Sequence, residues 1–155
     1  MSEHYSAKEI HPAQTKDAPR VAACANAAFR HYIERIGNLP QPMLADYDEL
    51  IQQGNVWVIE LNEAIVGILV LAITAEGFLL DTVAVDPLHQ GQGFGAALID
   101  FAEAQALRAD FDSIYLYTHE KMVENRSAYL KIGYAEYDRR NENGYSRVYL
   151  RKSLV

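Results

Sequence analysis

Apolar residues in the first third of the chain recur at the spacing of an amphipathic helix. Asp17 as the N-cap and Pro19 in the first turn mark where this helix begins. Its buried face is predicted from residues three or four apart, namely Val21, Ala25, Ala28, Phe29, Tyr32 and Ile36. The segment IGNLPQP at 36–42 ends the helix, and a shorter helix follows and stops at Gly54.

The middle of the chain changes to runs rich in Val, Ile and Leu, which are typical of buried strands. Three such runs span 56–61, 64–75 and 77–85, and the short breaks between them suit hairpin turns. We therefore expect three consecutive antiparallel strands at the centre of a sheet. A further short strand is expected at Tyr5–His11.

Beyond residue 85, helical and strand patterns alternate. Residues 96–109 predict a helix, 113–119 a strand, and 122–132 a helix that ends at Gly133. The order strand, helix, strand implies a right-handed parallel crossover. The segments YAEYDRR and YSRVYLR, on either side of 141–144, predict a closing hairpin. Residues 1–155 are thus expected to form a single domain of the α/β class with a mixed sheet.

The composition excludes several classes of function. No apolar run approaches the roughly 20 residues that cross a bilayer, and no secretory signal begins the chain, so we expect a cytoplasmic protein without membrane contacts. The formal net charge of −7 argues against binding of nucleic acid, which requires clustered Lys and Arg. Cys24 suits a small buried thiol, His89 and His119 suit solvent-facing positions, and no metal-binding pattern is present.

Three glycines, Gly91, Gly93 and Gly95, stand at alternate positions between a strand and a helix. The first N–H groups of a helix have no internal acceptor, so such a loop binds anions, most readily a pyrophosphate. GQGFGA at 91–96 also fits the dinucleotide fingerprint G-x-G-x-x-G/A. A dinucleotide fold, however, places this fingerprint after its first strand, and barely 60 residues follow the loop here.

With Gln90 included, the loop QGQGFG resembles the Q/R-x-x-G-x-G/A signature of the GNAT superfamily of acyl-CoA-dependent N-acetyltransferases. The preceding TVAVDP at 82–87 resembles the strand before that loop. A second block, MVENRSAYLKIGYAE at 122–136, resembles the family segment that carries Asn, Tyr, Gly and an aromatic residue, here Asn125, Tyr129, Gly133 and Tyr134. The resemblance covers residues 4–151 and implies the GNAT fold, a splayed central mixed sheet flanked by helices.

The resemblance implies acetyl-CoA as the co-substrate, with its pantetheine arm in the gap of the sheet. The backbone of Val83, Ala84 and Val85 would bind that arm like an added strand. Asn125 would bond to the cofactor or to a water, unless it caps its own helix. The pyrophosphate would lie on the N–H groups of the loop that follows Gln90, namely those of Gly91, Gln92, Gly93, Phe94, Gly95 and Ala96.

Acetyl transfer to an amine requires a base, a donor to the oxyanion and an acid for the departing thiolate. The resemblance assigns the acid to Tyr129, whose phenol is protonated at neutral pH, although the ring also suits simple packing. Asp81 and Glu120 are the candidates for the base, acting directly or through water. The backbone N–H of Val83 or of a neighbour would meet the oxyanion.

These observations lead to an interpretation as an N-acetyltransferase that uses acetyl-CoA and a primary amine by direct attack in a ternary complex. The acceptor would be a small-molecule amine or an amine of a protein or peptide, and the family leaves room for a homodimer. Four side chains are candidates for the acceptor wall, namely Tyr32, Arg35, Met43 and Tyr47. The alternatives are a CoA-binding sensor without catalysis and a small NAD-binding protein.

Overall fold

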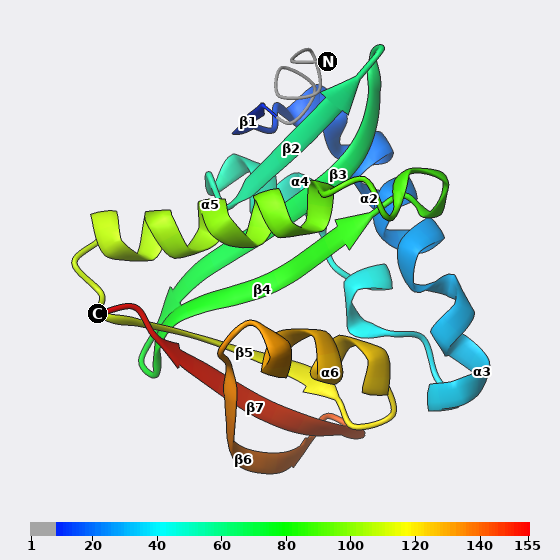
Figure 1. Ribbon diagram of the computed structural model, residues 1–155. Coiled ribbons are helices and arrows are strands. Elements are labelled where there is room, and N and C mark those ends of the chain that lie inside the picture. The colour runs from blue at the N-terminus through cyan, green and yellow to red at the C-terminus, as the bar shows by residue number, and fades with distance from the viewer. Residues whose placement is uncertain (1–8) are drawn as a thin grey trace.

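The computed structural model describes residues 9–155, which form a seven-stranded sheet with helices on both faces (Figure 1). The strands are β1 (Ile10–Pro12), β2 (Val56–Leu61), β3 (Ala64–Thr74), β4 (Gly77–Val85), β5 (Ser113–His119), β6 (Ala135–Glu142) and β7 (Tyr145–Ser153). Their order is β1-β2-β3-β4-β5-β7-β6, and only β4 and β5 are parallel neighbours. The expected mixed α/β class is confirmed.

The helices cover the two faces of the sheet unequally. The longer ones are α2 (Ala18–Phe29), α4 (Tyr47–Gln52), α5 (Phe94–Arg108) and α6 (Val123–Lys131), joined by the short α3 (Ile33–Ile36). Helices α5 and α6 lie on one face in Figure 1, and α2 lies on the other. No helix within residues 9–155 combines the length and the apolar composition needed to cross a membrane.

Two elements at the N-terminal side differ from expectation. The helix expected to continue to Ile36 ends at Phe29, where the chain tightens into a 3-10 turn before α3. The tighter turn keeps Tyr32 buried, at 5% exposed. The strand expected at Tyr5–His11 overlaps β1 at its last two residues, and residues 5–8 lie outside the described part of the chain.

The core consists of two main clusters, one on each face of the sheet. On the α2 face, fully buried residues of the helix pack against alternate residues of β2 and β3, among them Val21, Ala25, Val58, Ile68 and Val70. On the α5 face, the complementary residues of the strands meet the apolar side of the helix, among them Leu69, Leu80, Leu98, Ala102, Ile114 and Leu116. Because both faces are covered, the central strands read as continuous apolar runs.

The sheet splays between β4 and β5. These two strands are paired at a single position, Leu79↔Tyr115, whereas β4 stays paired with β3 as far as Val85 and β5 with β7 as far as His119. Beyond Leu79 the strands therefore diverge, as Figure 1 shows. The splayed sheet that the resemblance implied is confirmed.

A β-bulge lies in β4 where the divergence begins. Thr82 pairs with Val70 but Leu80 pairs with Leu71, so Asp81 is an extra residue without a partner on β3. A bulge bends its strand and re-aims a side chain. Asp81 thereby faces the space between β4 and β5.

Candidate functional site

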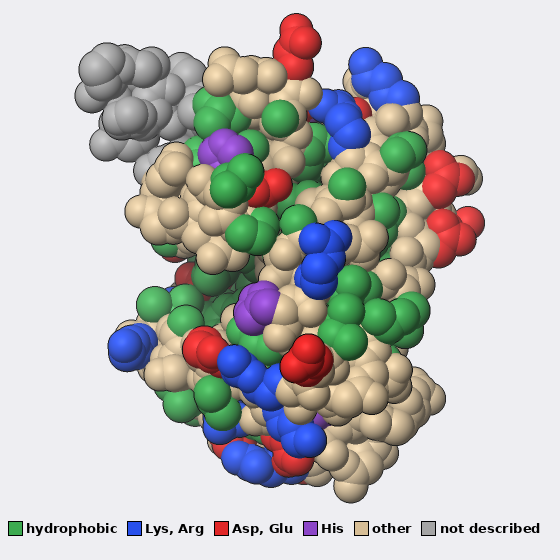
Figure 2. Space-filling view, turned by 90° about the vertical axis from the view of Figure 1, so that its right-hand side faces the viewer, with side chains coloured by type: hydrophobic (Ala, Val, Ile, Leu, Met, Phe, Trp, Pro, Cys, Tyr) green, Lys and Arg blue, Asp and Glu red, His purple; other side chains and the backbone are tan. Residues whose placement is uncertain are grey.

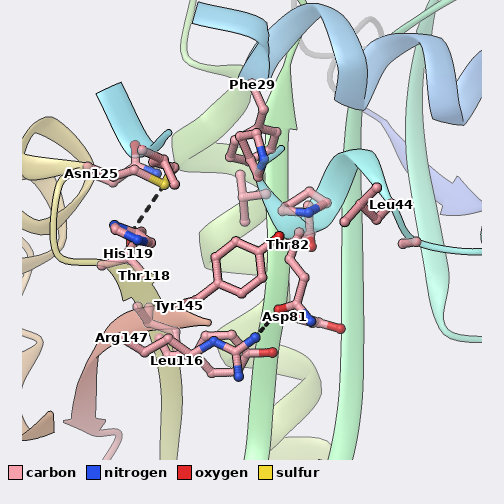
Figure 3. Close-up of a pocket in the computed structure, with 18 of the residues that line it drawn as sticks. Phe29, Leu44, Asp81, Thr82, Leu116, Thr118, His119, Asn125, Tyr145 and Arg147 are labelled. Carbon is pink, nitrogen blue, oxygen red and sulfur yellow. Dashed lines mark hydrogen bonds between the residues drawn. The ribbon is translucent and has the colours of Figure 1, made fainter. Parts of the chain in front are cut away.

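Two adjoining cavities occupy the space that the diverging strands leave. The larger, called the main cavity here, holds about 550 Å³ between β4, β5, β7, α6 and the segment 36–45 (Figure 3). The smaller, the loop cavity, holds about 450 Å³ between the end of β4, the glycine loop and the end of α2. Phe29, Val83 and Asn125 line both cavities. A ligand that fills the loop cavity thus reaches the main cavity beside these three residues.

Most of the residues expected to bind the cofactor line the loop cavity. They are Val83, Ala84, Val85, Gln90, Gly91, Phe94, Gly95 and Asn125. The side-chain amide of Gln90 donates to the Val85 carbonyl at 3.2 Å and so ties the loop to the end of the strand. Gln92, Gly93 and Ala96 belong to the same loop and helix start without lining this cavity.

The backbone of β4 presents alternate amides to the gap. The Asp86 N–H donates to the Val66 carbonyl at 2.8 Å, so the backbone of every second residue, including Ala84, faces β3. By the same alternation, the amides of Val83 and Val85 face the gap. Val83 is therefore the amide best placed where the two cavities meet.

The glycine loop presents a row of unpartnered donors. Within residues 9–155, no group accepts a hydrogen bond from the N–H groups of 91–96, and the first helical bond runs from Ala97 to Gly93 at 3.1 Å. Gly91 and Gly93 have φ values of 80° and 87°, a conformation that residues with a side chain rarely adopt. A Cβ on Gly95 would instead meet Val85 Cγ2 at 3.8 Å, an ordinary contact. The backbone conformation thus requires two of the three glycines.

Asp81 brings a carboxylate into the main cavity. Burial raises the pKa of this carboxyl, and the positive charge of Arg147 offsets the effect only in part. None of the described residues donates a hydrogen bond to the Asp81 carboxylate. A carboxylate of raised pKa that is free to accept is suited to take a proton from a bound group.

Tyr129 and Asn125 lie one turn apart on α6 and both line the main cavity. Burial raises the pKa of the Tyr129 phenol, so it stays protonated well beyond neutral pH. No described residue accepts a hydrogen bond from this hydroxyl, and the ring meets Tyr134 edge to face at 5.4 Å. The N-cap of α6 is Met122, which removes the interpretation of Asn125 as a helix cap.

Glu120 is separated from the other candidates. It lines a shallow, charged depression that also contains Arg35, Lys121 and Arg126, outside the main cavity. Side chains of both signs mingle on the lower part of the face drawn in Figure 2. The chain turns after His119, so Glu120 leaves the line of β5. Of the two carboxylates expected near the reacting amine, the structure brings only Asp81 into the cavity.

The four residues expected to contact the acceptor lie in four different places. Tyr47 lines the main cavity, Tyr32 lines the loop cavity and Arg35 lies at the charged depression. Met43 packs against the core instead. The Tyr47 hydroxyl donates to the Pro42 carbonyl at 2.5 Å, which holds the segment in place.

Sequence reasoning missed several residues of the main cavity. Tyr117 and His119 alternate on β5, Tyr145 and Arg147 alternate on β7, and Arg147 is paired with His119. His119 was expected to face solvent, but it is half-buried, its Nδ1 accepts the Lys121 N–H at 3.1 Å, and burial lowers its pKa. The period-2 alternation of polar residues on β7 was the available signal, but it needed the strand register to be useful.

Arg147 is the most buried charged residue of this wall, at 8% exposed. Its guanidinium donates to Glu142 at 3.0 Å and to the side chain of Gln41, and it lies 4.5 Å above the centre of the Tyr117 ring. Its charge is therefore compensated within the protein.

The position of Cys24 decides what its thiol can do. Cys24 is buried, as expected, and burial raises the pKa of its thiol to about 12, which leaves it without nucleophilic character. Within residues 9–155, no three His, Cys, Asp or Glu side chains gather in a way that could hold a metal ion.

Known proteins share this architecture. The GCN5-related N-acetyltransferase from Rhodopseudomonas palustris is 21% identical, with a TM-score of 0.74 over 94% of this chain and 95% of that one. The PaiA N-acetyltransferase from Thermoplasma acidophilum, in complex with coenzyme A, is 17% identical, with a TM-score of 0.72 over 94% and 98%. The yncA protein from Salmonella typhimurium, with its cofactor acetyl-CoA, is 16% identical, with a TM-score of 0.71 over 95% and 94%.

The assignment of the chain to a family rests on its sequence. No curated protein matches it significantly. Residues 52–136, more than half of the chain, match the family model of the acetyltransferase (GNAT) domain. This segment contains both the glycine loop and the Asn125–Tyr129 block that resembled the family. The chain therefore belongs to the GNAT acetyltransferase family.

Proposed function

We propose that the protein is an N-acetyltransferase that transfers the acetyl group of acetyl-CoA directly to a primary amine in a ternary complex. The observation that carries this proposal is the junction of the two cavities at Val83 and Asn125. One cavity ends in unpartnered loop amides and the other holds a free carboxylate. A donor and an acceptor bound in the two cavities would meet beside the open edge of β4.

The residues present fit a CoA thioester. The N–H groups of Gly91–Ala96 are suited to a pyrophosphate, because no described group accepts a hydrogen bond from them and the helix dipole adds to their attraction. The gap-facing backbone of Val83 and Val85 is suited to the amides of a pantetheine arm. Acetyl-CoA, when bound, supplies the activated acetyl group. The complexes of PaiA with coenzyme A and of yncA with acetyl-CoA support this choice.

The chain's own groups supply the proton transfers. The Asp81 carboxylate attracts the ammonium form of the acceptor and takes its proton, a task that its raised pKa favours. The Val83 N–H stabilises the negative charge that develops on the carbonyl oxygen. The Tyr129 phenol, kept protonated by burial, donates its proton to the leaving thiolate. Asn125, between the cavities, orients the thioester.

A panel of melting temperatures tests the cofactor assignment, because a ligand that binds only the folded state raises stability by mass action. The shift is measured with acetyl-CoA, CoA, NAD and ATP in parallel. We expect acetyl-CoA and CoA to raise the Tm and NAD to leave it unchanged. A shift with NAD alone would favour the dinucleotide alternative and overturn the proposal.

Turnover distinguishes an enzyme from a sensor. Release of the CoA thiol is followed with a set of primary amines, for the wild type and for Tyr129→Phe. Loss of a general acid costs about 10²-fold or more in kcat, whereas acetyl-CoA binding should persist. Tyr117→Phe, which changes another phenol of the same cavity, is the control. Acetyl-CoA binding without turnover on any amine would indicate the sensor.

A further inference from the structure

We propose that the acceptor is a compact amine with an aromatic or apolar body and a single positive charge, and without a carboxylate beside the amine. This inference rests on the proposed function and names its substrate class. It follows from the lining of the main cavity, from the charges that are free there, and from the contacts that close one of its sides.

Aromatic and apolar side chains form most of the wall of the main cavity. The residues that the argument uses are Phe29, Leu44, Tyr47, Leu116, Tyr117 and Tyr145. They come from α2, from the segment before and into α4, and from β5 and β7, so they surround the space instead of covering one side. Figure 3 labels Phe29, Leu44, Leu116 and Tyr145 among them. A cavity of about 550 Å³ with such a lining suits an apolar body about the size of one or two rings.

Asp81 is the only Asp or Glu among the described residues that line this cavity. Its carboxylate has no hydrogen-bond donor from the described part of the chain, so it is available to one ammonium group. A second ammonium on the ligand would find no second carboxylate and would lose its hydration without compensation. A single positive charge therefore fits better than a polyamine.

Arg147 is the only Lys or Arg that lines the described cavity, and its charge is already in use. Glu142 accepts from one terminal nitrogen at 3.0 Å, the side chain of Gln41 accepts from the other, and the Tyr117 ring covers one face. His119 offers no ready positive charge, because its Nδ1 accepts a backbone N–H. A ligand carboxylate would thus be buried without a partner, which is costly.

Contacts across the cavity close one of its sides, which excludes an extended polypeptide as the acceptor. The Tyr145 hydroxyl donates to the Leu39 carbonyl at 2.6 Å, and Arg147 bonds to Gln41 in the same segment. These contacts join the segment before α4 to β7, from opposite sides of the splayed sheet. An extended peptide would need this side open, whereas a small molecule fits behind it.

The test uses amines that differ in one group. The kcat/KM of the wild type is measured with two matched pairs. The first is 2-phenylethylamine and L-phenylalanine, which carries an additional carboxylate, and the second is butan-1-amine and butane-1,4-diamine, which carries a second amine. We expect 2-phenylethylamine to exceed L-phenylalanine by roughly 100-fold or more, the scale of the penalty for an unpaired buried charge. Butane-1,4-diamine should be used less well than butan-1-amine. Equal use of L-phenylalanine, or preference for the diamine, would overturn the inference.

A charge-neutral variant tests the role assigned to Arg147. Glu142→Gln keeps the shape of the partner but removes its charge, so the positive charge of the guanidinium is no longer compensated and can attract a ligand carboxylate. The ratio of kcat/KM for 2-phenylethylamine to that for L-phenylalanine should fall about tenfold. A variant that merely loosened the fold would lower both values and leave the ratio unchanged, and this result would contradict the assignment.

Binding measurements separate this inference from the proposed function. Thermal shifts with each amine are recorded in the presence and absence of CoA. If acetyl-CoA does not bind, the proposed function fails, and the amine shifts still decide the ligand class. If acetyl-CoA binds and L-phenylalanine is bound or acetylated as well as 2-phenylethylamine, the function stands and the substrate class is wrong.

Discussion

Burial gives Asp81 and Tyr129 complementary properties. In both cases a low-dielectric environment disfavours the charged form and raises the pKa. For a carboxylate this produces a stronger base, and for a phenol it ensures a proton that is present at neutral pH. Neither side chain receives or donates a hydrogen bond within residues 9–155, so each is available to a ligand. The same physical cause thus equips one residue as acceptor and the other as donor.

The raised pKa of Asp81 predicts that Asp81→Asn stabilises the fold while it abolishes activity. The folded-state pKa lies above the unfolded value, so the wild type bears a penalty for the charged form once the pH exceeds that folded-state pKa. The variant has no such penalty. Its Tm should exceed that of the wild type by about 2–4 °C near pH 8, which corresponds to about 1 kcal/mol for a chain of this size.

The pH dependence provides the control for this prediction. As the pH falls toward 3.8, the ordinary value for Asp, the wild-type carboxyl becomes neutral and the difference in Tm should disappear. Scanning calorimetry or fluorescence at several pH values measures it. A difference that stays constant with pH, or a less stable variant at pH 8, would show that Asp81 is held by interactions that the structure does not contain.

The sequence predicted some residues of the main cavity and not others. Asp81, Asn125 and Tyr129 were found because they belong to or adjoin two recognisable blocks, and all three line one cavity. Tyr117 and Arg147 were missed, because their position depends on the register between β5 and β7. Glu120 was misplaced relative to that cavity for a related reason, since one residue beyond the end of β5 the direction of the chain changes. The direction of a side chain near the end of a strand depends on the tertiary structure, so the local sequence pattern does not predict it.

At the scale of elements, the glycine loop predicts opposite results for two neighbouring substitutions. Gly91→Ala introduces a side chain at φ 80°, where it costs about 1–2 kcal/mol although the space around it is empty. Gly95→Ala lies in the first turn of α5 with an ordinary φ, and its Cβ would meet Val85 Cγ2 at 3.8 Å. Gly91→Ala should lower stability and acetyl-CoA affinity, and Gly95→Ala should preserve stability.

Urea unfolding and titration with acetyl-CoA measure both variants side by side. The comparison is matched because each change adds one methyl group to the same loop. If Gly91→Ala were as stable as the wild type and bound acetyl-CoA equally well, the conformation assigned to the loop would be wrong. If Gly95→Ala alone lost affinity, the methyl group would lie where the phosphates approach.

The strands and helices were largely predictable from local pattern. Apolar runs placed β2, β3 and β4 within one or two residues, because central strands are covered on both faces. The bulge at Asp81 was not predictable, since it appears only as a mismatch in pairing between β3 and β4. The divergence of β4 and β5 was expected only through the family resemblance. Alternation along one strand does not reveal where its neighbour departs.

For the whole molecule, the sheet consists of two halves, β1–β4 and β5–β7, called the two arms here. The arms are joined at one end, the closed end, and diverge toward the other. Near the closed end, Glu76 in the β3–β4 turn accepts two bonds from Arg140 at 3.0 and 2.8 Å and one from Tyr137 at 2.6 Å. Leu79↔Tyr115 is the single paired position of β4 and β5. Across the cavity, the Tyr145 hydroxyl bonds to the Leu39 carbonyl at 2.6 Å. The contacts at the closed end fix the angle between the arms. The Tyr145 bond fixes the position of the segment before α4, which forms the acceptor side of the cavity.

Tyr145→Phe should therefore weaken acceptor binding without affecting the cofactor. Loss of one hydrogen bond of about 0.5–1.5 kcal/mol loosens the segment before α4, so KM for the amine should rise about 3–10-fold. The loop cavity does not include Tyr145, so acetyl-CoA affinity should be unchanged. Tyr149→Phe is the matched control, because it removes a 2.6 Å bond to Glu142 within one arm. Steady-state kinetics with both substrates measure the KM values of the two variants. An unchanged KM for the amine in Tyr145→Phe, or an equal rise of that KM in Tyr149→Phe, would mean that the bond across the cavity does not control access to the cavity.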